Sequence, residues 1–372
     1  MASPRESSRR DVRVDLLRGI ALLTIFVDHI PGNLLGDLTF RNFGFSDAAE
    51  LFVVLAGFSS MMAYGGCFER DGAMPGLRRI GARCLRIYLV QIGLLVATLA
   101  IIWLWDRRFG LDGAEIQPIL DRGMRSGMTH GLILEALPAY LDILPLYVVL
   151  IGIFPLVYLL MRWNPIVALA LSGGLWLATN LDPALNLPNT VYHRLWFLDP
   201  FAWQFLFTIG TGMAMLMRRR DGRLPLVPGL RLVAWAYLLF ALVATAPWRV
   251  WGLWDMQLIA VPMAEKTVLA PLRLLDILAL VYLALTSEWL RAVAVRPAMA
   301  PIIACGKHSL EVFAVGTLLS LVGRLLFDTF GTPLLLQAVV NGVGFLVLFR
   351  LGWLLETGRV VARPAPAVGR RA

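Results

Sequence analysis

The residues with the clearest potential for chemistry lie in the first apolar segment of the sequence, near 15–35. Arg18 and His29 are eleven residues apart in this segment. At 100° per residue of an α-helix, this spacing returns both side chains to within about 20° of one face, roughly 16 Å apart along the axis. Imidazole is the natural general base near neutral pH, and ionisable groups inside a membrane are functional candidates by default. The spacing predicts one polar passage with a cation at one end and a base at the other. A snorkelling arginine and an interfacial histidine are the structural alternative.

A general base needs a second group that holds its tautomer, and two carboxylates are candidates. Asp28 precedes His29 but points about 100° away around the helix. Glu50, in the second apolar segment at 47–65, is the other candidate. Asp47 and Glu50 also have the spacing of a capping box, so a helix cap is the alternative for both. Pro31 has no N–H to donate, and we expect the first helix to kink or end there.

Further carboxylates and tryptophans lie near the predicted outer ends of the helices. Carboxylate oxygens accept hydrogen bonds from hydroxyl-rich ligands. We therefore expect an acceptor-binding vestibule made of Asp47, Asp142, Asp199, Asp276, Trp248 and Trp251. The three-residue spacing of Trp248, Trp251 and Trp254 predicts a short helix at the interface, and an aromatic belt at the membrane surface is the alternative to sugar binding.

Basic residues gather near the predicted cytoplasmic ends of the helices, where they would attract a phosphate-bearing donor. Gly306, Lys307 and His308 are expected to open the ninth helix. A helix N-terminus favours anions, so this end of the helix would bind a phosphate group. The residues expected at the donor side are Arg18, Arg78, Arg79, Arg83, Arg86, Lys307, His308 and Glu311. For most of them, a role only in setting membrane topology is the alternative.

The composition places these residues in a membrane protein. The chain has 372 residues, of which 58% are hydrophobic, and its mean hydropathy is +0.72. A membrane-spanning helix needs roughly 20 predominantly apolar residues. The sequence predicts an all-α polytopic protein of about ten transmembrane helices, near 15–35, 47–65, 81–104, 140–161, 164–180, 197–217, 231–247, 271–290, 302–323 and 333–355.

The net charge of +9 is a topology signal, because most basic residues fall in alternate loops. The positive-inside rule then places both termini in the cytoplasm and argues against nucleic acid as a partner. We expect one transmembrane domain, 14–358, between a disordered basic N-terminus, 1–13, and a disordered tail, 359–372. The sequence shows no internal repeat, which disfavours an inverted-repeat transporter. Its four histidines are scattered, so no metal site is expected.

Four motifs, in order along the chain, resemble the type-three membrane acyltransferase superfamily. They are Arg18 with His29, Glu50 with LFVVLAGF, Arg79 to Tyr88, and Gly306-Lys307-His308-Ser309. The stretches RVDLLRGIALLTIFVDHIPGN and GFSDAAELFVVLAGF resemble more narrowly the OpgC family, the osmoregulated periplasmic glucan succinyltransferases. The chain departs from the superfamily pattern at Leu310–Phe313, where a Tyr-rich run ending in His is usual, and at Leu89, where Pro is common.

The resemblance implies an O-acyltransferase of the bacterial inner membrane. It implies that succinyl-CoA arrives from the cytoplasm and that a periplasmic glucan hydroxyl receives the acyl group, without a metal. By the same resemblance, His29 would be the base or acyl relay, and Arg18 would assist donor binding. Another acyl donor or acceptor, or a transporter of polar substrates, is the alternative. The expected partners are acyl-CoA, the glucan and the lipid bilayer, and the sequence leaves the oligomeric state open.

Overall fold

The computed structural model describes residues 11–110, 117–121, 124–220, 222–245, 250–253 and 264–361. The described chain is almost entirely helical, which confirms the all-α fold class. Its helices are α1 (Val12–Asp28), α2 (Ala48–Ser60), α3 (Gly66–Arg70), α4 (Ala73–Phe109), α5 (Gln117–Asp121), α6 (Met124–Leu132), α7 (Ile143–Trp163), α8 (Pro165–Leu181), α9 (Pro200–Arg219), α10 (Pro228–Thr245), α11 (Pro271–Thr286), α12 (Glu288–Ala294), α13 (Ala300–Lys307), α14 (Ser309–Phe330) and α15 (Leu334–Val361). A π-turn, Met61–Gly65, joins α2 to α3.

In the part of the chain that the structure describes, the strands are limited to one short antiparallel pair, β1 (Pro188–Asn189) and β2 (Arg194–Leu195), in which Asn189 faces Arg194. Short 3₁₀ turns connect several elements, at Leu34–Leu38, Phe40–Asn42, Thr190–Tyr192 and Pro297–Met299.

Seven helices of the described chain are long and apolar enough to cross a membrane. One of them combines α2 with the π-turn and α3, and the others are α4, α7, α9, α10, α14 and α15. An eighth span would be α11 with α12, which meet at a bend of 71°. The remaining two predicted spans correspond to α1 and α8, which have 17 residues each. The chain is thus of the multi-pass membrane type, while the count of about ten and the cytoplasmic termini remain predictions.

Local sequence signals explain where several helices begin. Asp47, Asn164 and Asp199 each cap a helix with a side-chain oxygen that accepts a backbone N–H of the first turn. Proline follows two of these caps and also opens α11, where its missing N–H costs nothing. The predicted capping box at Asp47 and Glu50 is confirmed, since Glu50 accepts the N–H of Asp47 at 2.9 Å.

The predicted stop of the first helix near Pro31 is confirmed, while the predicted ninth helix differs from the structure. The first helix ends at Asp28, with His29 as its C-cap, because Pro31 and a left-handed Gly32 follow. The predicted ninth helix is broken at His308 into α13 and α14, so Lys307 ends α13 instead of opening a helix. The described helices extend slightly past the predicted domain, 14–358, since α1 starts at Val12 and α15 runs to Val361, and the rest of the two predicted disordered ends lies outside the described residues.

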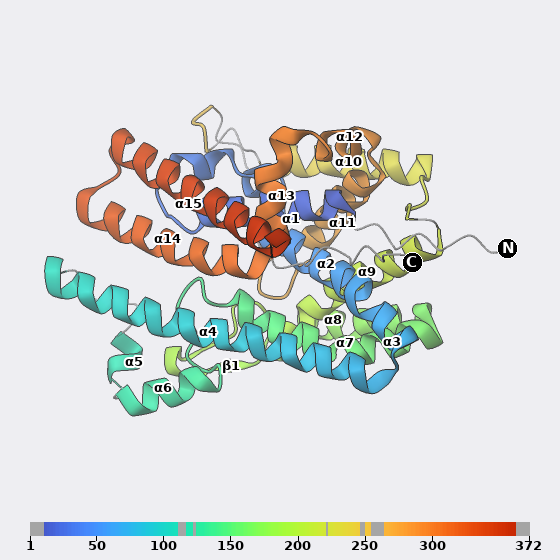
Figure 1. Cartoon of the computed structure of the whole chain (residues 1–372), viewed down its shortest axis with the longest axis horizontal. Helices are drawn as coiled ribbons and strands as arrows, with labels where there is room; N and C mark the ends of the chain where they lie inside the picture. The colour runs from blue at the N-terminus through green and yellow to red at the C-terminus, as the bar shows by residue number, and fades with distance from the viewer. Residues whose placement is uncertain are drawn as a thin grey trace, which may run out of the picture.

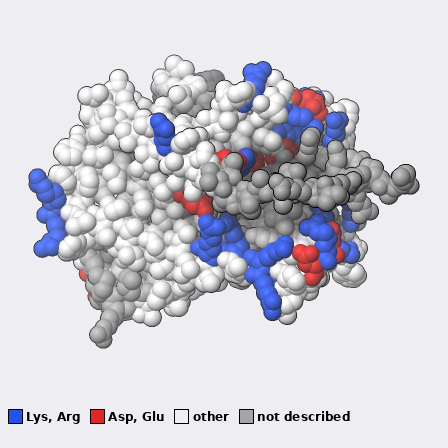
Figure 2. All heavy atoms as spheres, viewed as in Figure 1, with Lys and Arg blue, Asp and Glu red and all other residues white. Residues whose placement is uncertain are grey.

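The helices form two groups with α2 and α9 between them. Figure 1 shows α4, α7 and α8 along one side and α1, α13, α14 and α15 along the other. The end of the molecule with the first residues of α1 is here called the inner end, and the opposite end the outer end. On the face seen in Figure 2, most basic side chains gather toward the inner end, and large areas elsewhere are uncharged.

Two helix crossings bring backbones into direct contact through glycine. On α13, a Cβ at Gly306 would clash with the carbonyl oxygen of Asp15 on α1, and one at Gly19 of α1 would clash with the carbonyl of Ile302. Gly57 of α2 and Gly210 of α9 form the equivalent crossing. Small residues allow such close approach in membrane proteins, where apolar burial provides little drive for association. The glycine of the Gly306 motif is therefore explained by packing against α1.

We expect the substitution Gly306→Ala to lower the melting temperature of the detergent-solubilised protein by several degrees. Overpacking at a tight contact costs about 1–3 kcal/mol, and the clashing atom is backbone, which cannot move aside. Gly342→Ala is the matched control, because a Cβ there meets nothing within 4 Å. Equal melting temperatures for the two variants would contradict this account of the crossing.

Candidate active site

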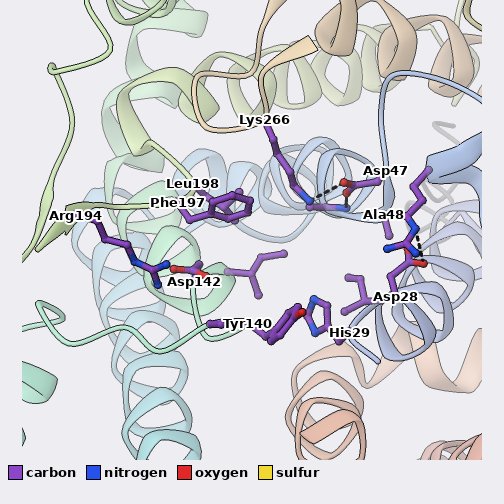
Figure 3. A pocket seen from close by; sticks show the side chains of 15 residues that line it. Asp28, His29, Asp47, Ala48, Tyr140, Asp142, Arg194, Phe197, Leu198 and Lys266 are labelled. Carbon is purple, nitrogen blue, oxygen red and sulfur yellow. Dashed lines mark hydrogen bonds and ion pairs between the residues drawn. The ribbon is translucent and has the colours of Figure 1, made fainter. Parts of the chain in front are cut away.

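A cavity of about 350 Å³ lies at the outer end of α1 (Figure 3). Its size falls within the usual range for small-molecule sites. Residues from five distant parts of the chain line it: Ile25, Asp28, His29, Arg41, Asp47, Ala48, Ala49, Ala139, Tyr140, Asp142, Ile143, Arg194, Phe197, Leu198 and Lys266. We call this space the outer cavity. It brings together four residues that the sequence singled out: His29, Asp28, Asp47 and Asp142.

His29 stands where α1 ends and packs against an aromatic ring. The ring centroids of His29 and Tyr140 are 4.6 Å apart, at an interplanar angle of 47°. The Tyr140 ring also contacts a cation, since the guanidinium carbon of Arg324, on α14, lies 5.0 Å from its ring centroid. Tyr140 has a φ of 67°, a left-handed conformation that is uncommon for a large residue. A strained residue in contact with His29 fits a functional role for this part of the cavity.

The structure does not give His29 a carboxylate partner within the described residues. No ion pair joins His29 to an acid within 4.0 Å, and its Nδ1 is buried without a hydrogen bond to a described group. Asp28 lines the same cavity, but its carboxylate accepts a hydrogen bond from the hydroxyl of Thr39 at 2.7 Å and forms an ion pair with Arg41 at 3.4 Å. The predicted pairing of His29 with Asp28 or Glu50 is therefore not what the structure shows.

Glu50 belongs to a buried ionic cluster beside the cavity. Its Oε1 accepts Nε of Arg273 at 2.7 Å, and the side chain is completely buried. Asp47 Oδ2 accepts Lys266 Nζ at 2.6 Å and an Arg273 guanidinium nitrogen at 3.0 Å. Two carboxylates and two cationic side chains thus pair with one another, and such pairing is what allows charges to be buried in a low-dielectric interior. Of the four, Asp47 and Lys266 also line the outer cavity.

The other residues predicted for the acceptor have structural contacts instead. Asp199 caps α9 by accepting the N–H of Phe201, and Asp276 accepts both the N–H and the hydroxyl of Ser46. Neither lines the outer cavity. Trp251 donates from its indole nitrogen to the carbonyl of Asp37 at 3.3 Å. Trp248 and Trp254 lie outside the described residues.

Arg18 lines a second cavity, also of about 350 Å³, at the inner end of α1. Its guanidinium donates to the hydroxyl of Ser59 and to the carbonyl of Leu55 at 3.3 Å. The rest of this wall is Asp11, Val14, Asp15, Phe58, Met62 and Ala63. We call it the inner cavity. Met62 and Ala63 belong to the π-turn, an irregularity that is common at functional sites.

Arg18 and His29 thus lie on one helix but in two cavities, and the single passage expected from the sequence is replaced by two. Ala21 and Leu22, between them on α1, are buried in the apolar core. The other predicted donor residues do not line the inner cavity. Lys307 and His308 both bind Glu356 of α15, and Arg86 pairs with Glu311. Arg79 pairs with Asp71, while Arg78 and Arg83 show no ion pair among the described residues.

Several residues of the outer cavity were not found from the sequence. They are Arg41, Tyr140, Arg194, Phe197 and Lys266, all in loops or at element ends. Lys266 carried a signal, since it is one of only two lysines in the chain. Within the described ranges, no group of three or more His, Cys, Asp or Glu side chains is placed to hold a metal ion.

A family model described as OpgC protein matches residues 10–359, nearly the whole chain. A search of curated proteins found no match.

We expect Arg273→Gln to destabilise the protein strongly, because it leaves Glu50 buried without its cation. Breaking a buried pair in this way costs about 3–5 kcal/mol. The double variant with Glu50→Gln should recover part of the loss, since it removes the unpaired charge. Thermal unfolding in detergent measures both effects. Arg231→Gln, at an exposed arginine, is the control, and a melting temperature for Arg273→Gln equal to that control would refute the assignment.

Proposed function

The chain belongs to the OpgC protein family, and from this membership we propose that it moves a succinyl group from succinyl-CoA to hydroxyl groups of periplasmic glucans. The family implies a multi-pass membrane protein that modifies glucans by acyl transfer. In this proposal, succinyl-CoA approaches from the cytoplasm and the glucan from the periplasm, so the protein lies in the bacterial inner membrane. His29 is the base or acyl relay of the transfer.

The observation that carries this proposal is the position of His29. Its imidazole lines a cavity of about 350 Å³ that also presents carboxylates, cations and an aromatic ring. The neutral imidazole has one ring nitrogen that accepts a proton, and none of the described acids pairs with the ring. The cavity lies at the outer end of the same helix whose inner end carries Arg18, so α1 connects a donor side to an acceptor side.

The chemistry needs only a base and a reactive acyl donor. A glucose hydroxyl is a poor nucleophile until its proton is removed. In the direct route, His29 accepts that proton while the hydroxyl oxygen attacks the thioester carbonyl. The carbon–sulfur bond breaks, and the coenzyme A thiolate takes the proton back from the imidazolium. In the relay route, a ring nitrogen of His29 attacks the thioester carbonyl, the carbon–sulfur bond breaks and coenzyme A leaves as the thiolate. The hydroxyl oxygen then attacks the acyl carbon, the bond to the ring nitrogen breaks, and the hydroxyl proton ends on the coenzyme A thiolate.

The inner cavity supports the donor side of the proposal. Arg18 is fixed by the hydroxyl of Ser59 and the carbonyl of Leu55, so its guanidinium has a defined direction. Because Ala21 and Leu22 are buried between the two cavities, the acyl-bearing arm of the donor has to separate α1 from its neighbours locally. The transfer is therefore coupled to a conformational step, which is common in enzymes that exclude water.

We expect His29→Ala to reduce acyl transfer by about 10²- to 10⁴-fold, the usual contribution of a general base. The succinyl content of glucans extracted from cells, measured by mass spectrometry, reports the loss in vivo. Release of free thiol by purified protein supplied with succinyl-CoA and unsubstituted glucan reports it in vitro.

His130→Ala is the matched control. His130 lies on α6, binds the carbonyl of Ser126 at 2.8 Å and does not line the outer cavity. Normal glucan succinylation in the His29→Ala strain, with the variant present in the membrane, would contradict the proposal. Glucan flux through wild-type vesicles without any thiol release would favour a transporter instead.

A further inference from the structure

The wall of the outer cavity formed by Asp142, Arg194 and Phe197 has no part in the proton transfer described above. We propose that these three side chains form a binding subsite for one hexose ring of the glucan acceptor. This inference rests on the proposed function and deepens it, because it names the groups that would hold the acceptor near His29. Figure 3 shows Arg194 and Asp142 side by side, across the cavity from the Asp47–Lys266 pair.

Asp142 is buried in a way that its structural position does not explain. It precedes α7 as the N-cap residue, yet its side chain makes no capping hydrogen bond, unlike those of Asp47 and Asp199. The residue is only 7% exposed, and its Oδ1 has no hydrogen-bond partner among the described residues. A buried carboxylate that lines a cavity without satisfying its acceptors is costly unless a ligand provides donors.

Arg194 is the cation of this cavity that forms no ion pair within 4.0 Å with a described carboxylate. One guanidinium nitrogen donates to the carbonyl of Leu137 at 3.0 Å, and the guanidinium carbon lies 5.3 Å from the ring centroid of Tyr192. The other two cations of the wall, Arg41 and Lys266, are paired with Asp28 and Asp47. Arg194 is thus held in a fixed direction while keeping donors for a ligand.

The scaffold under these two residues is rigid. The side-chain amide of Asn189 is completely buried and makes two hydrogen bonds to the backbone of Leu137, at 3.2 and 3.0 Å. Asn189 also faces Arg194 across the β1–β2 pair. The hairpin that carries Arg194 and the loop that leads to Asp142 are therefore fixed to each other before any ligand arrives. Preorganisation of this kind reduces the entropy cost of binding.

The pairing of a carboxylate with a guanidinium selects a hydroxyl. Asp142 and Arg194 are neighbours, but no ion pair within 4.0 Å joins them. A hydroxyl fits between them because it donates to the carboxylate and accepts from the guanidinium at once. Vicinal hydroxyls of a sugar ring offer this combination repeatedly. An anionic ligand at Arg194, such as the free carboxylate of the acyl group, would instead be repelled by Asp142.

Phe197 completes the subsite with an apolar surface. Its side chain is 43% exposed on the cavity wall, two residues past the β2 strand. Lys266 Nζ lies 5.8 Å from its ring centroid, so the ring is next to the ionic cluster. An exposed aromatic ring beside hydrogen-bonding side chains suits the CH-rich face of a pyranose, which is apolar while its edges are polar.

The test measures acceptor binding apart from catalysis. Purified His29→Ala protein in detergent is titrated with unsubstituted glucan in a calorimeter. The same titration is made with two double variants, which carry Asp142→Asn or Arg194→Lys in addition to His29→Ala. Asp142→Asn keeps the shape of the side chain and removes its charge. We expect either addition to weaken glucan binding by at least tenfold. The matched control is Arg107→Gln in the same His29→Ala protein. The guanidinium carbon of Arg107 also lies over an aromatic ring, 4.6 Å from the ring centroid of Trp103, but Arg107 does not line the cavity.

Glucan binding that is equal in all four proteins would overturn the subsite. In the active protein, Asp142→Asn and Arg194→Lys should raise the KM for glucan and leave the KM for succinyl-CoA unchanged. The opposite pattern would show that Arg194 recognises the acyl carboxylate and would also overturn the subsite. The proposed function is tested separately by the in vivo effect of His29→Ala, so failure of one does not imply failure of the other. Melting temperatures equal to wild type exclude misfolding as the cause.

Discussion

The contact on which the site depends is the crossing of α1 with α13. Glycines at positions 19 and 306 let the two backbones touch, so that no side chain separates them. In lipid, such contacts rely on dispersion and on weak Cα–H···O interactions, because apolar side chains gain little by leaving a medium that is equally apolar. Once α1 is fixed there, Ser320 of α14 donates to the carbonyl of Phe26 and fixes its outer half as well. The directions of Arg18 and His29 follow from this placement.

The second constraint is electrostatic and limits what the outer cavity is able to do. Asp47, Glu50, Lys266 and Arg273 come from two segments more than 200 residues apart, yet they neutralise one another. Intramembrane charges are often functional, but a satisfied cluster of this kind stabilises the fold and positions α2 against α11. Under the proposed function, the chemistry of the cavity falls to groups outside this cluster, namely His29, Asp142 and Arg194.

Much of the fold could be predicted from the sequence, because local signals set it. Long apolar runs marked the helices, and the capping box at Asp47 and the helix stop before Pro31 were visible as short patterns. Helix geometry also predicts a shared face for Arg18 and His29, which stays a prediction because the two side chains line separate cavities. What failed were statements about distant partners. The sequence leaves Glu50 as a candidate partner of His29, because nothing local shows that Arg273, 223 residues away, donates a hydrogen bond to its carboxylate. Tyr140, Arg194 and Lys266 reach the cavity only through tertiary packing of loops. The motif at Gly306 was read as an anion site, although its glycine is needed where α13 touches α1.

The replacement of one passage by two cavities has a physical reason in the proposed reaction. A channel open to water at both ends would let protons and other ions cross the membrane with every thermal fluctuation, at the expense of the transmembrane potential. Buried Ala21 and Leu22 close that route while leaving a polar space at each end of α1. A donor that carries its acyl group on a long thin arm is able to part such an apolar layer, whereas a hydrated ion pays its full desolvation cost there. In the proposed reaction, the same layer would separate the two aqueous compartments and would select the kind of molecule that connects them.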